Sequence, residues 1–416
     1  MSFRTRTWIA CTSLALAGCS FLNPFDDASG DGSGGGGGQG GALGSGGADA
    51  TGGVVGSGGT VEILPGLVVV GGDADGNPAT DDQVLLALSP QTGKELARRE
   101  GNYSAAVHEA ERDIWFLMQG DKVRAAKFDR GTNEWKELGA EATAVVPVDA
   151  LQVFALNGSL AVLGAGAQLS VYDTSKLDEI KLVDAVAYPS SPSVFWGAVG
   201  VPSSAGGNVH VLSVLCDAVL PCTVQLTRIK VDDASVQAIG PALVQEMNVT
   251  TTNGIGSIAY NATTSEVVVV VPDLGNVEGG TSVIRTFSSS HLPLKQFSLP
   301  QKTAQPRWSA LDPCQGVIYV MVPPALPMLA AGLFDGPDRG VMDKAVGVNG
   351  QGMFFEPYTR SLLLLQKSGD SFAVNAWSVS GTSEMPNIKK RISNWQPPQI
   401  RPSFASVALP KTSLCE

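Results

Sequence analysis

Short apolar runs separated by turn residues recur along the chain from Val61 onward, and this pattern constrains the fold most strongly. The runs are four to seven residues long, most are rich in β-branched residues, and Gly, Pro, Asn, Asp or Ser bound them. No stretch keeps a helical apolar period over three turns, so helices are not expected. The sequence therefore predicts an all-β domain, with strands at 67–70, 84–88, 114–118, 209–215, 266–271, 317–322 and 362–365.

A larger unit also repeats: a strand of small residues, a turn, a strongly apolar strand and a more polar hairpin. The small-residue strand recurs at 104–107, 257–260, 308–311 and 352–355, each followed about ten residues later by its apolar partner. Aligned units of about 48 residues are typical of propeller blades. We therefore predict a β-propeller over 61–416, most simply with seven blades, while six or eight stay open as alternatives. The units lie near 60–100, 101–142, 143–192, 193–245, 246–300, 301–345 and 346–396.

The first unit lacks a small-residue strand, and a segment of that kind stands at 403–408, near the C-terminal end. A propeller closes when one blade takes strands from both ends of the chain, which leaves no open sheet edge. We therefore expect 403–408 to complete the first unit.

Several motifs resemble known propeller repeats. Residues 128–135 have an aromatic-Asp-x-x-Thr-Asn-x-Trp pattern that resembles the outer hairpin of a kelch repeat, and Gly71-Gly72 resembles its paired glycines. Such glycines let neighbouring backbones pack closely. Residues 92–95 resemble a quinoprotein-type repeat, and 171–173 resemble another propeller repeat. These resemblances imply a kelch-like or quinoprotein-like propeller and carry over no specific activity.

Residues 1–18 are predicted to be a signal peptide. Two arginines precede an apolar stretch at 8–17, which is shorter than the roughly 20 apolar residues that span a bilayer. The stretch ends in the motif 16–19, Leu-Ala-Gly-Cys, which resembles a bacterial lipoprotein box. The resemblance implies cleavage before Cys19 and lipidation of its thiol, with acyl chains such as palmitate holding the protein on the membrane. An ordinary cleaved signal with a chance cysteine is the alternative.

Residues 19–60 are predicted to be a disordered tether. They are rich in Gly, Ser and Asp and hold hardly any apolar residues, so burial cannot offset the entropy of ordering them. A glycine-rich coil of this length spans about 35 Å root-mean-square. Ser20 follows Cys19, with no aspartate to signal retention in the inner membrane, so we expect the propeller to be anchored to the outer membrane.

The charge and the histidines exclude some functions. The net charge is −11, with 28 basic against 39 acidic residues, which argues against electrostatic binding of nucleic acid. His108, His210 and His291 lie far apart in the sequence, which disfavours a metal site built from histidines. We expect no cofactor.

The densest acidic cluster contains the candidate calcium ligands of the chain. Pro78 and Leu85 stand where an EF-hand loop requires glycine and a bidentate glutamate, so a solvated hairpin loop is the preferred interpretation. The candidate ligands are Asp73, Asp75, Asn77 and Asp81.

The cysteines outside the leader segment predict two disulfides. Cys216 and Cys222 bracket a short hairpin between apolar strands, and an exported compartment favours oxidation. Cys314 and Cys415 form the second pair, whose loop of about 100 residues would stabilise the fold by up to about 4.7 kcal/mol. The aligned units place this pair on the sixth and first units, which do not touch. Either the C-terminal tail crosses over or this bridge is absent.

The sequence shows no catalytic constellation. It lacks a Gly-x-Ser-x-Gly elbow, and no Ser–His or Cys–His pair is suggested by spacing. The tryptophans are expected to wedge between blades, with a sugar-stacking face as the alternative: Trp115, Trp135, Trp196, Trp308, Trp377 and Trp395.

We therefore predict a monomeric binding or scaffolding module, with an unknown protein or polysaccharide as its partner. Loops on a rigid propeller would provide the contact surface, at 72–82, 203–208, 271–281 and 323–343. One alternative is a propeller enzyme that acts on polysaccharide, such as a lyase or glycosidase. Another is a subunit of an outer-membrane assembly machinery, by resemblance to its propeller lipoprotein.

Overall fold

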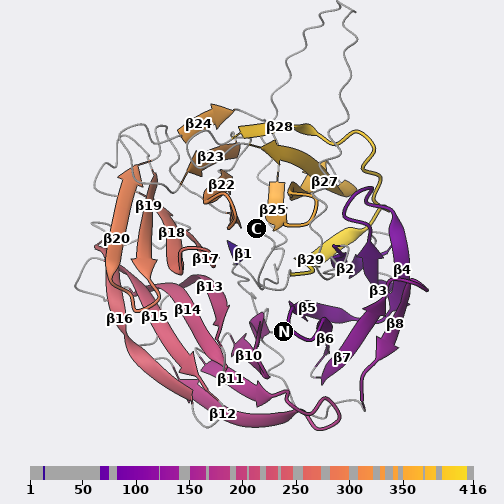
Figure 1. The fold of residues 1–416 in the computed structure, drawn as a ribbon, viewed down its shortest axis with the longest axis horizontal. Helices are drawn as coiled ribbons and strands as arrows, with labels where there is room; N and C mark the ends of the chain where they lie inside the picture. Colours follow the sequence, from indigo (N-terminus) through magenta and orange to yellow (C-terminus); the bar gives the residue numbers. More distant parts are fainter. Residues whose placement is uncertain are drawn as a thin grey trace, which may run out of the picture. The chain divides into compact units, whose positions relative to one another are not determined.

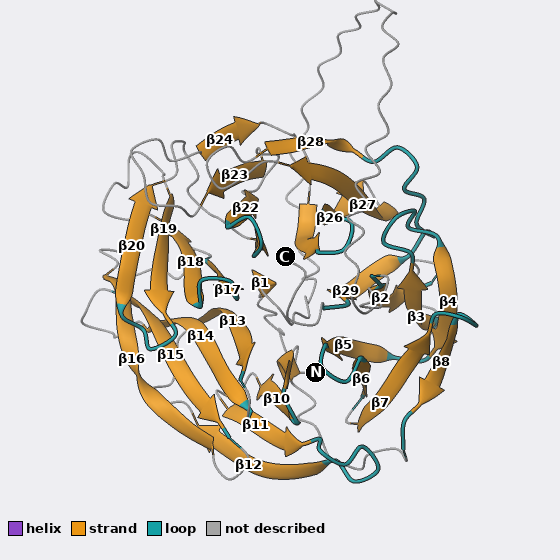
Figure 2. Cartoon of the chain, viewed as in Figure 1, coloured by secondary structure: helices purple, strands orange, loops and turns teal. Residues whose placement is uncertain are grey.

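The fold is built from β-strands. Within the described residues, all regular secondary structure is β-strand (Figure 2). Apart from 13–14, the predicted signal peptide and tether lie outside these residues, so both stay predictions. The computed structural model describes residues 13–14, 66–74, 82–120, 122–139, 150–164, 168–187, 194–203, 206–215, 222–232, 236–246, 256–272, 282–298, 308–321, 328–332, 341–344, 350–368, 371–380 and 387–409.

Among the described residues, six sheets have four antiparallel strands each. From its innermost strand outward, the first contains β29 (Arg401–Val407), β2 (Val68–Asp73), β3 (Gln83–Leu88) and β4 (Glu95–Glu100). In the same inner-to-outer order, the next two contain β5 (Tyr103–Glu109), β6 (Ile114–Gln119), β7 (Lys122–Asp129) and β8 (Glu134–Glu137), then β9 (Ala150–Leu156), β10 (Ser159–Gly164), β11 (Gln168–Asp173) and β12 (Lys181–Ala187).

The remaining four-stranded sheets follow the same order. They contain β13 (Val194–Pro202), β14 (Gly207–Leu215), β15 (Thr223–Val231) and β16 (Val236–Glu246); β17 (Ser257–Asn261), β18 (Glu266–Pro272), β19 (Ser282–Ser288) and β20 (Pro293–Ser298); and β25 (Gly350–Glu356), β26 (Ser361–Ser368), β27 (Ser371–Ser380) and β28 (Asn387–Arg391).

One further sheet has five strands, because a two-residue strand joins its inner edge in parallel. It contains β1 (Ser13–Leu14), β21 (Trp308–Asp312), β22 (Val317–Met321), β23 (Met328–Gly332) and β24 (Val341–Lys344).

The sheets form a closed ring. Their innermost strands contact one another in the order β29, β5, β9, β13, β17, β21, β25 and again β29 (Figure 1). Radially arranged sheets of this kind define a β-propeller. The prediction of an all-β propeller is therefore confirmed. The small-residue strands found in the sequence lie in the innermost strands β5, β17, β21 and β25.

The C-terminal strand closes the ring. β29 pairs antiparallel with β2, from Val68↔Val407 to Asp73↔Arg401, as expected for a strand near 403–408. A Cβ atom at Gly71 would lie 2.1 Å from the Phe404 ring. One at Gly72 would lie 2.2 Å from the carbonyl oxygen of Arg401. The glycine pair is thus required by the close approach of the closing strand, as the sequence indicated.

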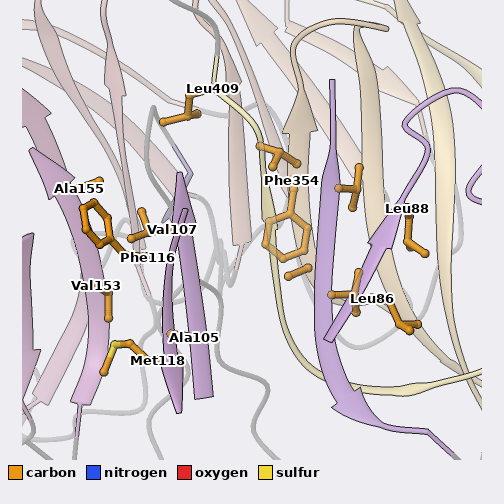
Figure 3. Packing of buried hydrophobic residues seen from close by; sticks show 14 of the residues in the cluster. Leu86, Leu88, Ala105, Val107, Phe116, Met118, Val153, Ala155, Phe354 and Leu409 are labelled. Atoms are coloured by element: carbon orange, nitrogen blue, oxygen red, sulfur yellow. The ribbon is translucent and has the colours of Figure 1, made fainter. Parts of the chain in front are cut away.

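The hydrophobic core lies between the faces of neighbouring sheets. Small side chains such as Ala105 on β5 allow bulkier ones such as Phe116 on β6, Val153 on β9 and Leu86 on β3 to join one buried cluster (Figure 3). Residues 267–271 of β18 are all buried, because both faces of that strand are covered. The strand therefore reads as a continuous apolar run and does not alternate.

The motif at 128–135 forms an outer hairpin, as its pattern predicted. It covers the end of β7 and the start of β8. The Asp129 carboxylate accepts hydrogen bonds from the N–H groups of Gly131 and Thr132, at 2.9 and 3.3 Å. The rings of Phe128 and Trp135 pack edge to face with centroids 5.2 Å apart. The side chain that starts the turn and the aromatic pair that flanks it thus fix this hairpin locally.

Candidate functional site

Each sheet has connections at two ends, and the two ends differ. At one end lie the turns between first and second strands and between third and fourth strands. We call this the tied end. Its inner turns, at 110–113, 157–158, 203–206, 262–265, 313–316 and 357–360, hold only two or four residues. At the opposite end, second strands lead to third strands and each sheet leads to the next, and the connections reach the length of 138–149 and 247–256.

Buried side chains at the ends of three inner strands shape the turns at the tied end. Asn261 ends β17, and its Oδ1 accepts the N–H groups of residues 263 and 264, at 3.1 and 3.4 Å. Asp312 ends β21 and accepts the N–H groups of 314 and 315, at 3.0 and 3.2 Å. The Glu356 carboxylate ends β25 and accepts those of 358 and 359, at 3.1 and 2.7 Å. A polar residue that ends an apolar strand therefore sets its own turn, a signal that the sequence analysis missed.

A polar contact bridges every junction between neighbouring sheets at the tied end. Most of these contacts use a side chain of one sheet and a backbone group of the next. Around the ring they are Leu409 N–H to His108 Nδ1 (2.9 Å), Arg112 to the Thr174 carbonyl (2.7 Å), Asn157 to the Ser203 carbonyl, Arg228 to the Ser289 carbonyl (3.1 Å), Thr263 to the Pro313 carbonyl (2.8 Å), Arg360 to Asp312 (2.6 Å) and Tyr358 to the Leu409 carbonyl (3.3 Å).

His108 forms the centre of the junction where the two chain ends meet. Its Nδ1 accepts the N–H of Leu409, and its Nε2 lies 3.1 Å from Asp113 Oδ1. Because a backbone N–H can only donate, Nδ1 carries no proton and Nε2 donates to Asp113. The imidazole is therefore neutral. Burial lowers the pKa of His108 and outweighs the opposing effect of Asp113.

Asp113 is held as a carboxylate in this centre. Burial acts to raise its pKa, but the hydrogen bond from His108 and the charges of Arg130 and Lys127 together lower it. Arg130 and Lys127 each lie 3.5 Å from Asp113 Oδ2. Both imidazole nitrogens of His108 and both oxygens of Asp113 thus have partners. This His108–Asp113 centre therefore holds the propeller closed.

A second histidine centre joins the sheets β13–β16 and β17–β20. His210 on β14 and His291 in the β19–β20 turn are 81 residues apart in sequence, yet His210 Nδ1 lies 2.7 Å from His291 Nε2. His210 is fully buried and His291 is 9% exposed. Burial, followed by the neighbouring charges, lowers the pKa of His210 to about 3 and that of His291 to about 4. The sequence shows the histidines only as far apart along the chain, because no local pattern indicates that β14 meets this turn.

The buried carboxylates near the inner turns are engaged by the protein itself. Asp312 is completely buried and pairs with Arg360 from the next sheet. Glu356 is also completely buried, and burial raises its pKa against the effect of its hydrogen-bond donors. In the part of the chain that the structure describes, no cluster of three or more His, Cys, Asp or Glu side chains could hold a metal ion. Asp312 and Glu356 therefore serve contacts within the protein.

Most sequence-predicted site residues lie outside the described ranges. These are Cys19, Cys216, Cys415, Asp75, Asn77 and Asp81. Asp73 ends β2 and is buried. The lipidation, calcium and disulfide predictions therefore stay predictions.

The position of the last described residues bears on the bridge between Cys314 and Cys415. Leu409 leaves the ring at the tied end, where its carbonyl accepts a hydrogen bond from Tyr358. Arg360 of the same turn reaches Asp312, two residues before Cys314. Cys415 lies outside the described residues, so the bridge and the crossing of the tail stay predictions.

The predicted contact loops do not share one end of the ring. Residues 72–82 and 271–281 connect second to third strands, so they belong to the end opposite the tied end. Residues 203–208 form the inner turn between β13 and β14, at the tied end. Residues 323–343 contain β23 and are not one loop. The prediction of a single surface from these four segments was therefore wrong, because strand order sends them to different ends.

Three tryptophans are buried in the described core. Trp115 and Trp196 are each 1% exposed, and Trp395 is 4% exposed. Trp196 of β13 lies against Gly256, which precedes β17 in the next sheet, and a Cβ atom at Gly256 would be 2.6 Å from the Trp196 ring. Trp395 donates its Nε1–H to the carbonyl of Val374 at 2.6 Å. The wedge role is visible at Trp196, whereas the side chain of Trp308 lies outside the described residues.

Comparisons with known proteins identify the fold and go no further. No family model matches the sequence, and no curated protein matches it. A functionally unknown protein from Desulfotomaculum acetoxidans is 10% identical, with a TM-score of 0.51 over 83% of this chain and 99% of that chain. The periplasmic gluconolactonase of Pseudomonas aeruginosa is 10% identical, with a TM-score of 0.51 over 82% and 99%. A Lactobacillus plantarum protein is 9% identical, with a TM-score of 0.50 over 82% and 99%.

These similarities support the propeller fold alone, because one fold hosts many functions. No helix in the described ranges is long and apolar enough to cross a membrane.

Proposed function

We propose that this chain is a binding propeller of the bacterial cell envelope, held to the outer membrane through a lipid on Cys19. The observation that carries the proposal is the continuous set of polar contacts at the tied end, one at each junction between sheets. These contacts use many polar groups of the tied end to join neighbouring sheets to one another. The opposite end is therefore assigned to the partner.

Connection lengths support this assignment. Loops on a rigid scaffold are the usual place for binding residues. The connections 138–149 and 247–256 leave from the opposite end, as do 74–82 and 273–281 from the predicted contact surface. A partner of the ring, protein or polysaccharide, would meet these four connections together.

The N-terminal segment supplies the proposed attachment. Cleavage before Cys19 would remove β1 and leave β21–β24 as a four-stranded sheet. We accordingly assign seven blades to the mature propeller. Residues 19–60 would then tether the ring at a distance from the membrane. Mass spectrometry of the mature protein tests this point, with an acylated Cys19 expected and an unmodified or uncleaved N-terminus contradicting it.

The two disulfides belong to the same proposal, because an exported chain meets an oxidising compartment. Cys216 would bond to Cys222, and Cys314 to Cys415. Peptide mapping without reduction should show both linked peptides. Free thiols at these positions would remove this part of the proposal.

The binding role is tested by shortening connections at the opposite end. The connection 74–82 or 273–281 is replaced with a short Gly-Ser turn, and the immobilised proteins are used to capture partners from envelope extract. We expect loss of the captured species at an unchanged melting temperature. Glu134→Ala on the exposed strand β8 is the matched control and should capture normally. Undiminished capture by both shortened proteins would contradict the assignment.

The alternative is an enzyme, and the similarity to the fold of a periplasmic gluconolactonase favours a sugar lactone as the substrate to try first. A polysaccharide hydrolase would instead need two carboxyl groups about 5 to 9.5 Å apart in one pocket. Hydrolysis of gluconolactone by the purified protein, measured against buffer and against the same shortened variants, separates the two functions. Turnover that the shortened variants lose would favour the enzyme, whereas rates equal to buffer would favour the binding module.

A further inference from the structure

We propose that the His210–His291 pair makes one junction of the ring acid-sensitive, so that the sheets β13–β16 and β17–β20 separate there when both imidazoles are protonated. The pair bridges these sheets directly, with 2.7 Å between His210 Nδ1 and His291 Nε2. The ring centroids are 5.0 Å apart. This inference does not depend on the proposed binding function.

The short distance allows only one proton between the two nitrogens. One nitrogen must donate and the other must accept, which two neutral imidazoles or one neutral and one charged imidazole can satisfy. When both rings are charged, both nitrogens carry hydrogen, and two donors then face each other. The contact cannot persist in that state, so the second proton breaks it.

The groups around the pair oppose protonation of the imidazoles, because the charge that acts on both of them is positive. Arg228 on β15 is the described charged group that acts on both imidazoles, and its charge lowers both pKa values. The same guanidinium donates to the Ser289 carbonyl at 3.1 Å, in the turn that carries His291. The second ring nitrogen of His210 is buried and has no hydrogen-bond partner. A proton placed there would be a buried charge without an acceptor, beside a cation.

The turn that carries His291 is itself held in a restricted conformation. His291 has φ +67°, a left-handed value that is uncommon for residues with a side chain. The turn is closed by hydrogen bonds from His291 N–H to the Ser288 carbonyl and from Ser288 N–H to the Leu292 carbonyl, each 2.9 Å. If the imidazole contact is lost, the hydrogen bond from Arg228 to the Ser289 carbonyl still links this turn to β15. The positive charge added to the imidazoles then repels the Arg228 guanidinium.

The sign of the pH dependence follows from the lowered pKa values. Free imidazoles titrate near 6.5, whereas in the closed junction His210 and His291 have pKa values of about 3 and about 4. The closed junction therefore has its full stability above about pH 6.5 and loses it progressively as the pH falls toward 3. Opening should take up about two protons.

The first test observes the imidazoles directly. In the wild-type protein, a histidine-labelled NMR titration should show His210 and His291 neutral at pH 5 and protonated only as the junction opens. A reversible titration of either residue near pH 6.5, with the fold intact, would overturn the proposal. This test needs no variant, so it stands even if the variants fold poorly.

The second test removes one titrating group and keeps the turn. Gln does not titrate, and its amide can reach the position of the imidazole Nε2, so His291→Gln should preserve the contact. We expect its acid midpoint, followed by near-ultraviolet circular dichroism, to fall by about half a pH unit or more, with proton uptake reduced from about two to about one. His108→Asn at the other histidine centre is the control, and it should leave the titration of His210 and His291 unchanged. An acid midpoint of His291→Gln equal to the wild-type value would contradict the proposal.

Discussion

The two histidine centres of the ring place the same side chain in opposite surroundings. At the junction where the chain ends meet, His108 uses both ring nitrogens and faces the carboxylate of Asp113. Between β13–β16 and β17–β20, His210 leaves one nitrogen without a partner and lies near the cation Arg228. The closing strand is joined to the first sheet only by noncovalent contacts, and Leu409 is 301 residues from His108. The closing strand is thus held at its end by a centre in which both ring nitrogens of His108 and both oxygens of Asp113 have partners.

Glycine substitutions at the closing strand pair β2–β29 and at the junction between β13–β16 and β17–β20 should give the largest difference. At Gly72 a Cβ atom would meet backbone, 2.2 Å from the Arg401 oxygen, so Gly72→Ala must separate β29 from β2. We expect a loss of about 3 kcal/mol in the free energy of unfolding. Gly256→Ala meets the Trp196 side chain at 2.6 Å and should lose less, about 2 kcal/mol. Urea denaturation measures both, and equal losses would show that the closure is no more constrained than the other junction.

The next largest difference in the free energy of unfolding is expected when the imidazole is removed from each histidine centre. His108→Leu leaves the Leu409 N–H without its acceptor and Asp113 without its neutral donor, so we expect a loss of about 2 to 3 kcal/mol at pH 7. His291→Gln should lose less than about 1 kcal/mol, because its amide replaces the single hydrogen bond of Nε2. Denaturation of the two variants side by side tests the ranking. A greater loss for His291→Gln would reverse the comparison.

Acid should weaken the His210–His291 junction first. Between pH 7 and pH 5, each imidazole that stays neutral in the fold reduces the stability by up to about 2 kcal/mol, because the unfolded form binds a proton that the folded form does not. Chemical denaturation at both pH values measures the loss, and His291→Gln should recover part of it. A larger recovery by His108→Asn would show that acid acts first at the closure junction.

The smallest effect on the free energy of unfolding is expected at an exposed ion pair. Lys181 and Glu179 are 2.6 Å apart, with side chains 64% and 52% exposed. Lys181→Ala should leave the free energy of unfolding unchanged within the error of the measurement, because solvent and salt screen the pair. Thermal denaturation at low and high salt provides the measurement. A loss as large as that of His108→Leu would mean that exposed ion pairs also hold the propeller together.

The strands and the closure could be predicted because their signals are local. The run at 266–271 is apolar at nearly every position, and β18 (Glu266–Pro272) is the strand that it predicted. The Gly71-Gly72 pair indicated a close backbone approach, and β29 supplies it. The turn-setting role of Asp312 could also have been found, because a polar residue that ends an apolar strand before a four-residue turn is a readable pattern.

The histidine centres could not be predicted, because their partners come from distant parts of the chain. His210 meets His291 only after two sheets have packed, and the orphaned nitrogen follows from that packing. The division of the predicted contact loops between two ends likewise depends on strand direction within each sheet. Segment 203–208 has the polar composition of the other loops, yet strand order places it at the tied end.

The sequence by itself determined the all-β class, the repeating unit and the strand that closes the ring, because each depends on residue types a few positions apart. Only the tertiary structure decided which polar groups meet across the junctions and which end of the ring is left for a partner. Packing sets those contacts, since a hydrogen bond or a buried charge depends on the atoms that distant segments bring within about 3 Å.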